Sequence, residues 1–470
     1  MNILFCSSEV VPFAKTGGLA DVAGALPLAL KMLNHDIRIV MPKYGFIDEK
    51  KFSLKKLNNN LYTAKIADKV TVYFIDHKSF FKRDGLYGDK NGDYPDNLDR
   101  FSYFSQQVIA LIKEVDFIPD VVHCNDWQTA LIPVYLKTAC KNDSVYAKIK
   151  TVFTVHNLAY QGLFDKENFS KLGLDWKLFN MDYLEYYDKI NFLKGGLVFC
   201  DIITTVSEAY AKEIQTKEFG CGLEGLLTKR SKDLFGIING LDYNLWDPEK
   251  DKMIYKKYSA KAYKAKHENK RQLQAECGLA VKEDALLCGM VSRLAEQKGV
   301  DVLSASLQEL IKLNLQVVIL GTGDLKYHDL LARLAKKYKD KISVFLKFDN
   351  VIAHKIYAGS DLFLMPSRYE PCGLGQMISL KYGTVPLVYK TGGLADTVID
   401  CQKDKTKGNG FVFEKFDKKE FISTVKRALA VFEENKFNSL IGKAFKYNFS
   451  WKSSASKYID LFNRLVKGRV

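Results

Sequence analysis

Short runs of Val, Ile, Leu and Phe alternate with stretches of helical period along almost the whole chain. Six such runs precede residue 210: NILFCSS, DIRIVMP, VTVYFID, DVVHCND, KTVFTVH and DIITTVS. The alternation restarts with ALLCGMVS, LQVVILGTG, ISVFLKF, DLFLMPS and TVPLVYK. Apolar runs of this length, bounded by turn residues, indicate strands. Strands that alternate with helices are typical of parallel sheets covered on both faces, so we predict an α/β fold.

The two series of strands indicate two domains, because 470 residues are too many for a single core. A turn-rich segment at 236–251, GIINGLDYNLWDPEKD, separates them. We predict Rossmann-like, doubly wound domains at 1–242 and 243–450, and a closing amphipathic helix at 451–470 that crosses back to the first domain. Two such domains would face a central cleft with the carboxyl ends of their strands, where ligands bind, and the cleft would open and close.

The composition of the chain limits where the protein is expected in the cell and what it is expected to bind. No apolar run is long enough to span a bilayer, and the opening MNILFCSSEV lacks the charged region of a secretory signal, so we expect a cytoplasmic protein without a membrane partner. Nine cysteines without a CxxC motif or paired spacing indicate reduced thiols. We predict no metal and no cofactor. The sequence leaves the oligomeric state open.

The net charge of +15 comes from lysines spread along the chain. Solvated lysine-rich faces are the common cause of such a balance. We expect no nucleic-acid partner, because the sequence has no basic helix, zinc finger or aromatic RNA-binding signature. A basic cleft for a phosphorylated small substrate fits the charge equally well.

The heptapeptide KTGGLAD occurs twice, at 15–21 and 390–396. The two copies could be no more than similar strand-to-helix turns, since Gly-Gly suits a tight turn before a helix. Alternatively, each copy aims a helix N-terminus into one shared cleft. Neither copy matches G-x-G-x-x-G, and GTGDLK at 321–326 matches it only in part, so a dinucleotide-dependent dehydrogenase has little support.

Charged residues follow two of the strands predicted in the second domain. Arg293 and Lys298 follow ALLCGMVS, and together they could hold a diphosphate, although an exposed basic turn is the commoner explanation of this segment alone. Glu370 follows DLFLMPS in the segment SRYEPCGLGQ, whose glycines permit close backbone approach at the start of a helix. Glu370 could bind sugar hydroxyls or simply cap that helix.

Polar residues also end two strands of the first domain. DVVHCNDW carries His123, Asn125 and Asp126, and KTVFTVHNLAYQG carries His156. A single histidine at a strand end is often only a packed residue. Two strands that end in polar residues strengthen the case for a functional site.

The order and length of these motifs resemble glycogen synthases of the bacterial type, whose pattern plastid starch synthases share. The resemblance rests on MNILFCSSEVVPFAKTGGLADVAGALP, DVVHCNDWQTAL, FTVHNLAYQG, EFGCGLEGLL, GIINGLDYNLWDP, SRLAEQKG, PSRYEPCGLGQ and LKYGTVPLVYKTGGLADTV, and it runs from residue 1 to about residue 455. It implies the GT-B glycosyltransferase architecture of two Rossmann-like domains. It also implies retaining transfer of glucose from ADP-glucose to the non-reducing 4-OH end of an α-1,4-glucan such as glycogen.

The resemblance implies four catalytic residues. His156 would lie against the donor glucose near the anomeric carbon, and Glu370 would bind the glucose 3- and 4-hydroxyls. Arg293 and Lys298 would neutralise the departing ADP. No carboxylate remains as a nucleophile, so we expect the acceptor to attack on the face that ADP leaves, with charge stabilisation supplying the catalysis.

Further residues are implied to bind substrate. In the first domain Lys15, Gly17 and Gly18 would meet the diphosphate, Asp21 would lie beside the nucleotide, and Tyr94 would lie near the donor. Lys390, in the second copy of the heptapeptide, is expected to be structural.

The remaining substrate contacts are implied around the sugar and the base. Phe348 would stack on adenine. The sugar pocket and the backbone contacts to sugar or phosphate would come from Asp126, Asn239, Cys372, Gly373 and Leu374.

Two departures from the family pattern bear on the donor. Gly375 stands where many relatives carry Thr, Asn or a larger residue, and Phe348 stands where Tyr is common. Both put nucleotide preference in question, so a UDP-glucose-dependent synthase is an alternative. A non-catalytic glucan-binding protein is a second alternative, which the intact set of charged residues disfavours.

Overall fold

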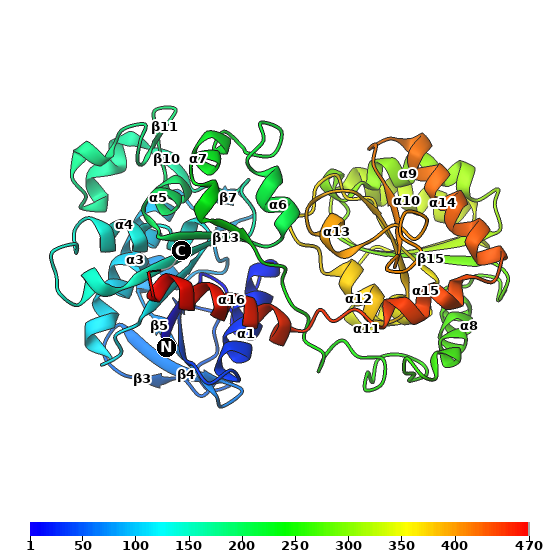
Figure 1. Ribbon diagram of the computed structural model, residues 1–470, viewed down its shortest axis with the longest axis horizontal. Coiled ribbons are helices and arrows are strands. Elements are labelled where there is room, and N and C mark those ends of the chain that lie inside the picture. The colour runs from blue at the N-terminus through cyan, green and yellow to red at the C-terminus, as the bar shows by residue number, and fades with distance from the viewer. Residues whose placement is uncertain (469–470) are drawn as a thin grey trace. The chain divides into compact units, whose positions relative to one another are not determined.

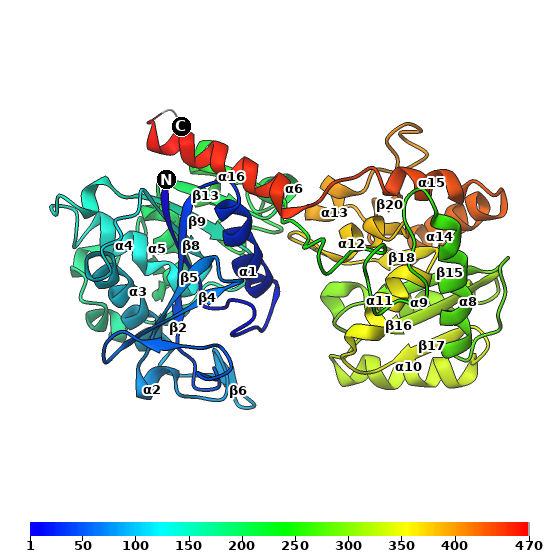
Figure 2. The same ribbon diagram turned by 90° about the horizontal axis from the view of Figure 1, so that it is seen from below.

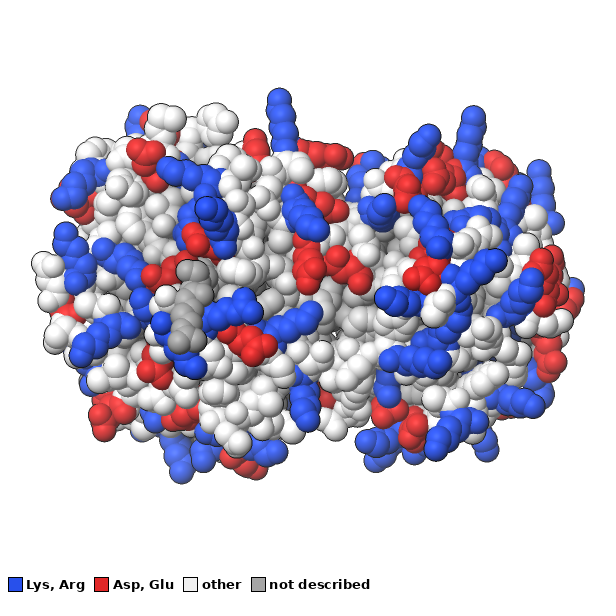
Figure 3. Space-filling view, viewed as in Figure 1, with Lys and Arg blue, Asp and Glu red and all other residues white. Residues whose placement is uncertain are grey.

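The computed structural model describes residues 1–468, which form two compact units (Figure 1). Unit 1 comprises Met1–Gly240 together with the C-terminal helix α16 (Trp451–Val466), and unit 2 comprises Leu241–Ser450. Each unit has its own sheet and its own helices, and each is described by itself. Figure 3 shows Lys and Arg scattered among Asp and Glu over this face of both units.

Unit 1 is built on a nine-stranded sheet in the order β14-β13-β9-β8-β1-β2-β5-β4-β3. The seven parallel strands are β1 (Asn2–Cys6), β2 (Asp36–Pro42), β5 (Val70–Ile75), β8 (Val121–Asn125), β9 (Lys150–Val155), β13 (Ile202–Thr205) and β14 (Leu234–Gly236). Two antiparallel strands, β4 (Leu61–Ile66) and β3 (Lys55–Lys56), close one edge. The parallel strands read as continuous apolar runs because helices cover both of their faces.

The covering helices of unit 1 lie on opposite sides of the sheet (Figure 2). One side carries α1 (Gly18–Lys31) and α16, which pack on each other. The other side carries α3 (Asn97–Glu114), α4 (Leu131–Lys137) and α5 (Phe192–Phe199). Shorter α-helices of this unit are α2 (Lys78–Phe81), α6 (Glu208–Glu213) and α7 (Glu224–Lys229).

Helix α16 covers the buried histidine of β8. The rings of Tyr458 and Phe462 lie 5.4 and 5.7 Å from the ring of His123, and Nε2 of His123 is 2.6 Å from Oγ1 of Thr154. Burial lowers the pKa of His123 to about 3. His123 is therefore a neutral packing residue beneath α16.

Replacing His123 with glutamine should make the protein less sensitive to acid. Between about pH 6.5 and pH 3 the unfolded chain binds a proton at this position that the folded chain excludes. The free energy of unfolding therefore falls as the pH falls, by up to about 1.4 kcal/mol per pH unit. Glutamine does not titrate, so the variant's melting temperature should drop less than that of the wild type between about pH 6 and pH 4. Equal drops would contradict the assignment.

The two chain crossings between the units run side by side. The backbone N–H of Leu241 donates to the carbonyl of Phe449 at 2.6 Å, and the N–H of Phe449 donates to the hydroxyl of Tyr243 at 2.8 Å. A Cβ on Gly240 would lie 2.5 Å from Cα of Trp451. Only glycine fits this crossing without displacing the backbone.

Unit 2 contains six parallel strands in the order β17-β16-β15-β18-β19-β20. They are β15 (Leu286–Val291), β16 (Leu315–Leu320), β17 (Ile342–Phe345), β18 (Leu362–Met365), β19 (Val385–Tyr389) and β20 (Phe411–Phe413). In chain order this arrangement is 3-2-1-4-5-6, the strand order of dinucleotide-binding Rossmann domains. The predicted α/β fold with Rossmann-like, doubly wound units is confirmed.

Helices cover both faces of the second sheet as well. The apolar side chains of α9 (Val300–Leu310), α10 (Leu325–Lys337), α14 (Lys418–Glu433) and α15 (Phe437–Ala444) share one core with the strands. Helices α8 (Lys266–Glu276), α11 (Asn350–Gly359) and α12 (Gly375–Lys381) pack on one another, and α13 (Gly392–Thr397) follows β19. Within residues 1–468 no helix is both long enough and apolar enough to cross a bilayer.

Strand order marks one point in each sheet where a ligand is expected. The chain leaves β1 toward β2 and later returns to β8 on the other side of β1, and it does the same around β15, with β16 on one side and β18 on the other. Ligands of open α/β sheets bind outside the carboxyl ends of the strands at such a reversal. The residues that follow β1, β8, β15 and β18 are therefore the first to examine.

Candidate active site

A buried carboxylate holds the first KTGGLAD loop in place at the end of β1. Glu9 is 4% exposed. Its oxygens accept hydrogen bonds from the backbone N–H and the hydroxyl of Thr16, from the N–H of Gly17 at 3.1 Å and from the hydroxyl of Tyr87 at 2.8 Å. Four donors on one carboxylate fix the loop in a single conformation. Glu9 is not among the residues predicted from the sequence, where its one signal is an acidic residue close behind a buried strand.

Gly17 and Gly18 lie in open space at the start of α1. A Cβ on either would meet no atom of residues 1–468 within 4 Å, and the φ of Gly17 is −145°, which any residue adopts. The packing of unit 1 therefore does not require glycine at these positions, whereas close approach of a ligand to the backbone would. Beside them Nζ of Lys15 lies 2.7 Å from Oδ1 of Asp21, and both side chains are exposed.

His156 is held in one tautomer by Asn125. The amide nitrogen of Asn125 donates to the carbonyl of Cys6 at 3.0 Å, so its oxygen is the atom that lies 2.9 Å from Nε2 of His156. Nε2 must then carry the hydrogen, which leaves Nδ1 as an acceptor. Burial lowers the pKa of His156 to about 3, so the ring is neutral at physiological pH. Neutral His156 can accept a hydrogen bond but is a very weak base.

Asp126 stands next to this histidine. Its Oδ1 accepts from the backbone N–H of His156 at 2.7 Å, and its own backbone has a positive φ of 55°. Burial, reinforced by the charge of Glu9, raises the pKa of Asp126 to about 7. A carboxylic acid that titrates near neutrality and sits at the reversal between β1 and β8 is typical of a functional site.

Asn239 and Tyr94 complete the predicted residues of unit 1. Oδ1 of Asn239 is buried and has no hydrogen-bond partner within residues 1–468, as expected of an acceptor that meets a ligand. The guanidinium groups of Arg83 and Arg100 lie 4.8 and 5.0 Å from the ring centroid of Tyr94. It is Tyr87, seven residues earlier, that hydrogen-bonds Glu9.

In unit 2 two cations and a carboxylate follow the strands at the reversal. Lys298, after β15, places Nζ 2.6 Å from Oε2 of Glu370, after β18, and both side chains are mostly buried. Arg293 is exposed, and its nearest polar contact is Oε1 of Gln297 at 3.3 Å. Within residues 1–468 no carboxylate lies in salt-bridge range of Arg293, so its charge is available to an anion. The strands that these three residues follow, β15 and β18, are adjacent in the sheet.

The second KTGGLAD copy supports the loop that carries Glu370. The N–H of Gly393 donates to the carbonyl of Glu370 at 3.1 Å, and a Cβ on Gly393 would lie 1.9 Å from the carbonyl oxygen of Cys372. Lys390 is exposed and pairs with Glu414 at 2.9 Å. The two copies thus differ in their surroundings, because the first faces open space and the second packs against backbone.

The loop between Glu370 and α12 requires glycine at one position. Gly373 has a φ of +71°, and a Cβ there would lie 2.5 Å from Oε1 of Gln376. A Cβ on Gly375 would meet the edge of Phe363 at 3.0 Å and the sulfur of Met365 at 3.1 Å, a tight but adjustable fit. Helix α12, which begins at Gly375, has only seven residues.

Phe348 presents an open ring after β17. Its side chain is 88% exposed, while the next residue, Asp349, caps α11 through the N–H of Ile352 at 3.0 Å. Strand β17 is two positions from β15, which corresponds to about 10 Å at the usual strand spacing. That separation suits a nucleoside whose diphosphate lies at the end of β15.

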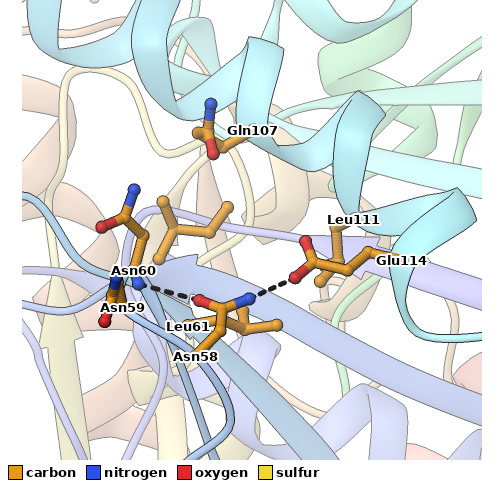
Figure 4. A pocket seen from close by; sticks show the side chains of 8 residues that line it. Asn58, Asn59, Asn60, Leu61, Gln107, Leu111 and Glu114 are labelled. Carbon is orange, nitrogen blue, oxygen red and sulfur yellow. Dashed lines mark hydrogen bonds between the residues drawn. The ribbon is translucent and has the colours of Figure 1, made fainter.

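The two pockets described next contain none of the site residues predicted from the sequence. A pocket of about 320 Å³ in unit 1 is lined by Asn58–Leu61, Gln107, Leu111 and Glu114, and in it Asn58 donates to Glu114 (Figure 4). A second groove of about 580 Å³ lies between α6, β14 and α16. No group of three or more potential metal-ligating side chains occurs within residues 1–468.

Comparison with known proteins agrees with these observations. The family model described as starch synthase catalytic domain matches residues 2–229, and that of glycosyl transferases group 1 matches residues 276–439. The chain is 48% identical to the glycogen synthase of Geotalea uraniireducens, over the full length of both, and 43% identical to that of Thermotoga maritima, over 99% of both.

Solved structures give the same result. The catalytic domain of starch synthase IV from Arabidopsis thaliana, bound to ADP and acarbose, matches with a TM-score of 0.89 and 34% identity over 99% of both chains. Sucrose-phosphate synthase from Thermosynechococcus elongatus, with a TM-score of 0.64 and 14% identity over 99% of both chains, shows likeness of fold alone. The chain is therefore a glycosyltransferase that belongs to the bacterial glycogen synthase and starch synthase family.

Proposed function

We propose that the protein transfers glucose from ADP-glucose to the non-reducing 4-OH end of an α-1,4-glucan, with retention at the anomeric carbon. The observation that carries the proposal is the mostly buried Lys298–Glu370 pair at the strand-order reversal of unit 2, where Arg293 follows the same strand as Lys298. An unpaired guanidinium, a lysine and a sugar-binding carboxylate suit a nucleotide sugar. The Arabidopsis relative binds ADP, which supports ADP as the nucleotide.

Retaining transfer by this group needs no protein nucleophile. The bond between the anomeric carbon and the diphosphate oxygen breaks, and the acceptor 4-oxygen bonds to the same face of the sugar. The acceptor proton passes to the departing phosphate oxygen. Arg293 and Lys298 stabilise the charge that develops on the diphosphate, which is the main catalytic contribution.

His156 contributes position rather than proton transfer. A ring whose pKa is about 3 is too weak a base to take a proton efficiently at neutral pH. Its unprotonated Nδ1 can instead accept a hydrogen bond from a hydroxyl of the donor glucose. Glu370 binds the 3- and 4-hydroxyls, and Asp126 and Asn239 shape the sugar pocket.

The proposed nucleotide contacts are supported by exposed side chains and by the open space beside two glycines. In unit 1, Lys15, Gly17 and Gly18 contact a diphosphate, with Asp21 beside the nucleotide, and in unit 2 Phe348 stacks on the base. The backbone of Cys372, Gly373 and Leu374 contacts sugar or phosphate. The ring of Tyr94 packs against the guanidinium groups of Arg83 and Arg100, so its proposed place near the donor has the least support.

The test is incorporation of glucose into glycogen from ADP-glucose and UDP-glucose side by side, with Glu370→Ala as the blank. Strong incorporation from ADP-glucose that is lost in the variant is the expected result. Glu414→Ala is the matched control, because Glu414 also follows a strand and pairs with lysine but is exposed. This control should retain the wild-type rate.

The other outcomes separate the alternatives. Preference for UDP-glucose would retain the mechanism and overturn the base assignment, since a stacked phenylalanine accepts either base. No incorporation from either donor would favour a non-catalytic glucan-binding protein.

A further inference from the structure

An insertion between β9 and α5 carries several aromatic side chains that are exposed to solvent. Residues 157–191 form a small sheet of β10 (Leu163–Asp165), β12 (Lys189–Asn191) and β11 (Glu185–Tyr186), at the edge of unit 1 in Figure 1. The exposed rings of this insertion are those of Tyr160, Trp176, Tyr183 and Tyr187. Exposed aromatic side chains gathered in one segment indicate a binding surface.

Tyr187 is the most exposed of these rings, and it is held in an unusual backbone conformation. It forms the turn between β11 and β12 with Asp188, and their φ angles are +49° and +64°. Such turns favour asparagine and glycine, and a bulky residue with positive φ is an outlier that points to function. The side chain of Tyr187 is 81% exposed, so burial does not explain its presence.

The surrounding contacts hold the turn that carries this ring. The ring of Tyr186 packs edge-on against Tyr187 with centroids 4.7 Å apart, and the hydroxyl of Tyr186 donates to the carbonyl of Cys221 at 2.9 Å. The N–H of Asp188 donates to Oε1 of Glu185 at 2.7 Å, and Asp188 pairs with Lys166 at 2.6 Å. A ring fixed in advance loses little conformational freedom when a ligand stacks on it.

The insertion is joined to the segment that carries His156. Gln161, five residues after His156, donates to the same carbonyl of Cys221 at 3.0 Å as the hydroxyl of Tyr186 does. Its amide oxygen also accepts from Asn191, at the end of β12. A ligand bound at the turn between β11 and β12 would therefore lie on a part of unit 1 that is hydrogen-bonded to the segment of the proposed sugar site.

The balance of acidic and basic residues in the insertion indicates which class of ligand it could bind. The insertion contains six acidic residues and four lysines, in a chain whose net charge is +15. A phosphate-rich ligand would need the opposite balance. Rings interspersed with carboxylates and amides instead fit a neutral ligand with apolar faces and polar edges, such as a pyranose chain.

We propose that the β11–β12 hairpin binds the acceptor glucan away from its reacting end, with one glucose unit stacked on Tyr187. The inference rests on the proposed function for the identity of the glucan. It adds an acceptor subsite that contains none of the residues assigned to the donor.

The test compares Tyr187→Asn with Tyr187→Phe. Asparagine tolerates positive φ, so the first variant keeps the turn and removes the ring, while the second keeps the ring and removes only the hydroxyl. Dissociation constants for maltoheptaose and glycogen are measured without donor. We expect Tyr187→Asn to weaken binding roughly fivefold to tenfold and Tyr187→Phe to stay within about twofold of wild type. Phe46→Ala, which removes an exposed ring outside the insertion, should change neither constant.

The remaining outcomes are distinguishable. Unchanged glucan binding in Tyr187→Asn would overturn the inference, and a shift in its oligomeric state on gel filtration would then identify the hairpin as a contact between copies. Wild-type protein that binds glucan through Tyr187 but transfers no glucose would overturn the proposed function and leave the subsite standing. Wild-type transfer with unaltered kinetics in Tyr187→Asn at low glycogen concentration would count against the subsite alone.

Discussion

Replacing Lys298 with alanine should lower kcat for glucosyl transfer by about 10²- to 10³-fold, which corresponds to about 2.7–4 kcal/mol of barrier. The reason is that Lys298 supplies a fixed positive charge where the leaving diphosphate becomes more negative. The pair with Glu370 at 2.6 Å holds the ammonium group in place before substrate arrives, so no reorganisation accompanies the reaction. Initial rates at saturating ADP-glucose and glycogen measure the effect.

A second consequence of this substitution is loss of stability. The carboxylate of Glu370 is only 10% exposed, and among residues 1–468 Lys298 is its one salt-bridge partner. Removing one partner of a buried ion pair costs about 3–5 kcal/mol. The melting temperature of unit 2 should therefore fall, and the double variant Lys298→Ala with Glu370→Gln should recover part of it without recovering activity.

Lys390→Ala provides the matched control for Lys298→Ala. Lys390 also follows a strand of the same sheet and also pairs with a glutamate, but both partners are exposed. Exposed pairs contribute about 0–1 kcal/mol, so stability should hardly change and kcat should remain near the wild-type value. If a well-folded Lys298→Ala protein kept more than about a tenth of kcat, charge stabilisation by this lysine would be wrong.

The sequence was sufficient for the fold because the fold depends on local patterns. Strands buried on both faces produce continuous apolar runs, and helices between them keep their own period, so two parallel sheets could be predicted. The antiparallel edge of unit 1 was not predicted. Its strand β4 alternates partly exposed residues with buried ones, and β3 is two exposed lysines, so neither gives a strong apolar signal.

The candidate site was predictable only where residues lie directly behind a strand. Arg293, Lys298 and Glu370 follow adjacent strands, as their positions in the sequence implied. Glu9 was missed because its role depends on Tyr87, which is 78 positions away, and on a loop that folds back over it. Long-range hydrogen bonds of this kind leave no mark on spacing or composition.

The repeated heptapeptide also shows that long-range contacts cannot be predicted from the local sequence. Identical residues occupy both copies, yet Gly18 faces open space and Gly393 lies against the carbonyl of Cys372. Whether a position requires glycine depends on the atoms that a Cβ would meet there. Those atoms can come from distant parts of the chain. The sequence alone therefore does not show which copy faces open space and which packs against backbone.

The same substitution in the two copies should give opposite effects on stability. Gly393→Ala would bring a Cβ to 1.9 Å from the carbonyl oxygen of Cys372 and 2.6 Å from its Cα, so the backbone of this loop must move. Such overpacking costs about 1–3 kcal/mol or more. Because the displaced loop carries Glu370, kcat should fall together with the melting temperature of unit 2.

Gly18→Ala should leave the fold intact and still impair the enzyme. Alanine at the start of α1 meets no atom within 4 Å and is favoured in helices over glycine by about 0.5–1 kcal/mol, so the melting temperature should stay constant or rise. If the diphosphate approaches this backbone, the added methyl group should raise KM for ADP-glucose. Calorimetry and initial rates on the two variants check both halves of the prediction. Wild-type kinetics in Gly18→Ala would mean that the first copy does not contact the donor, since nothing in unit 1 itself requires glycine there.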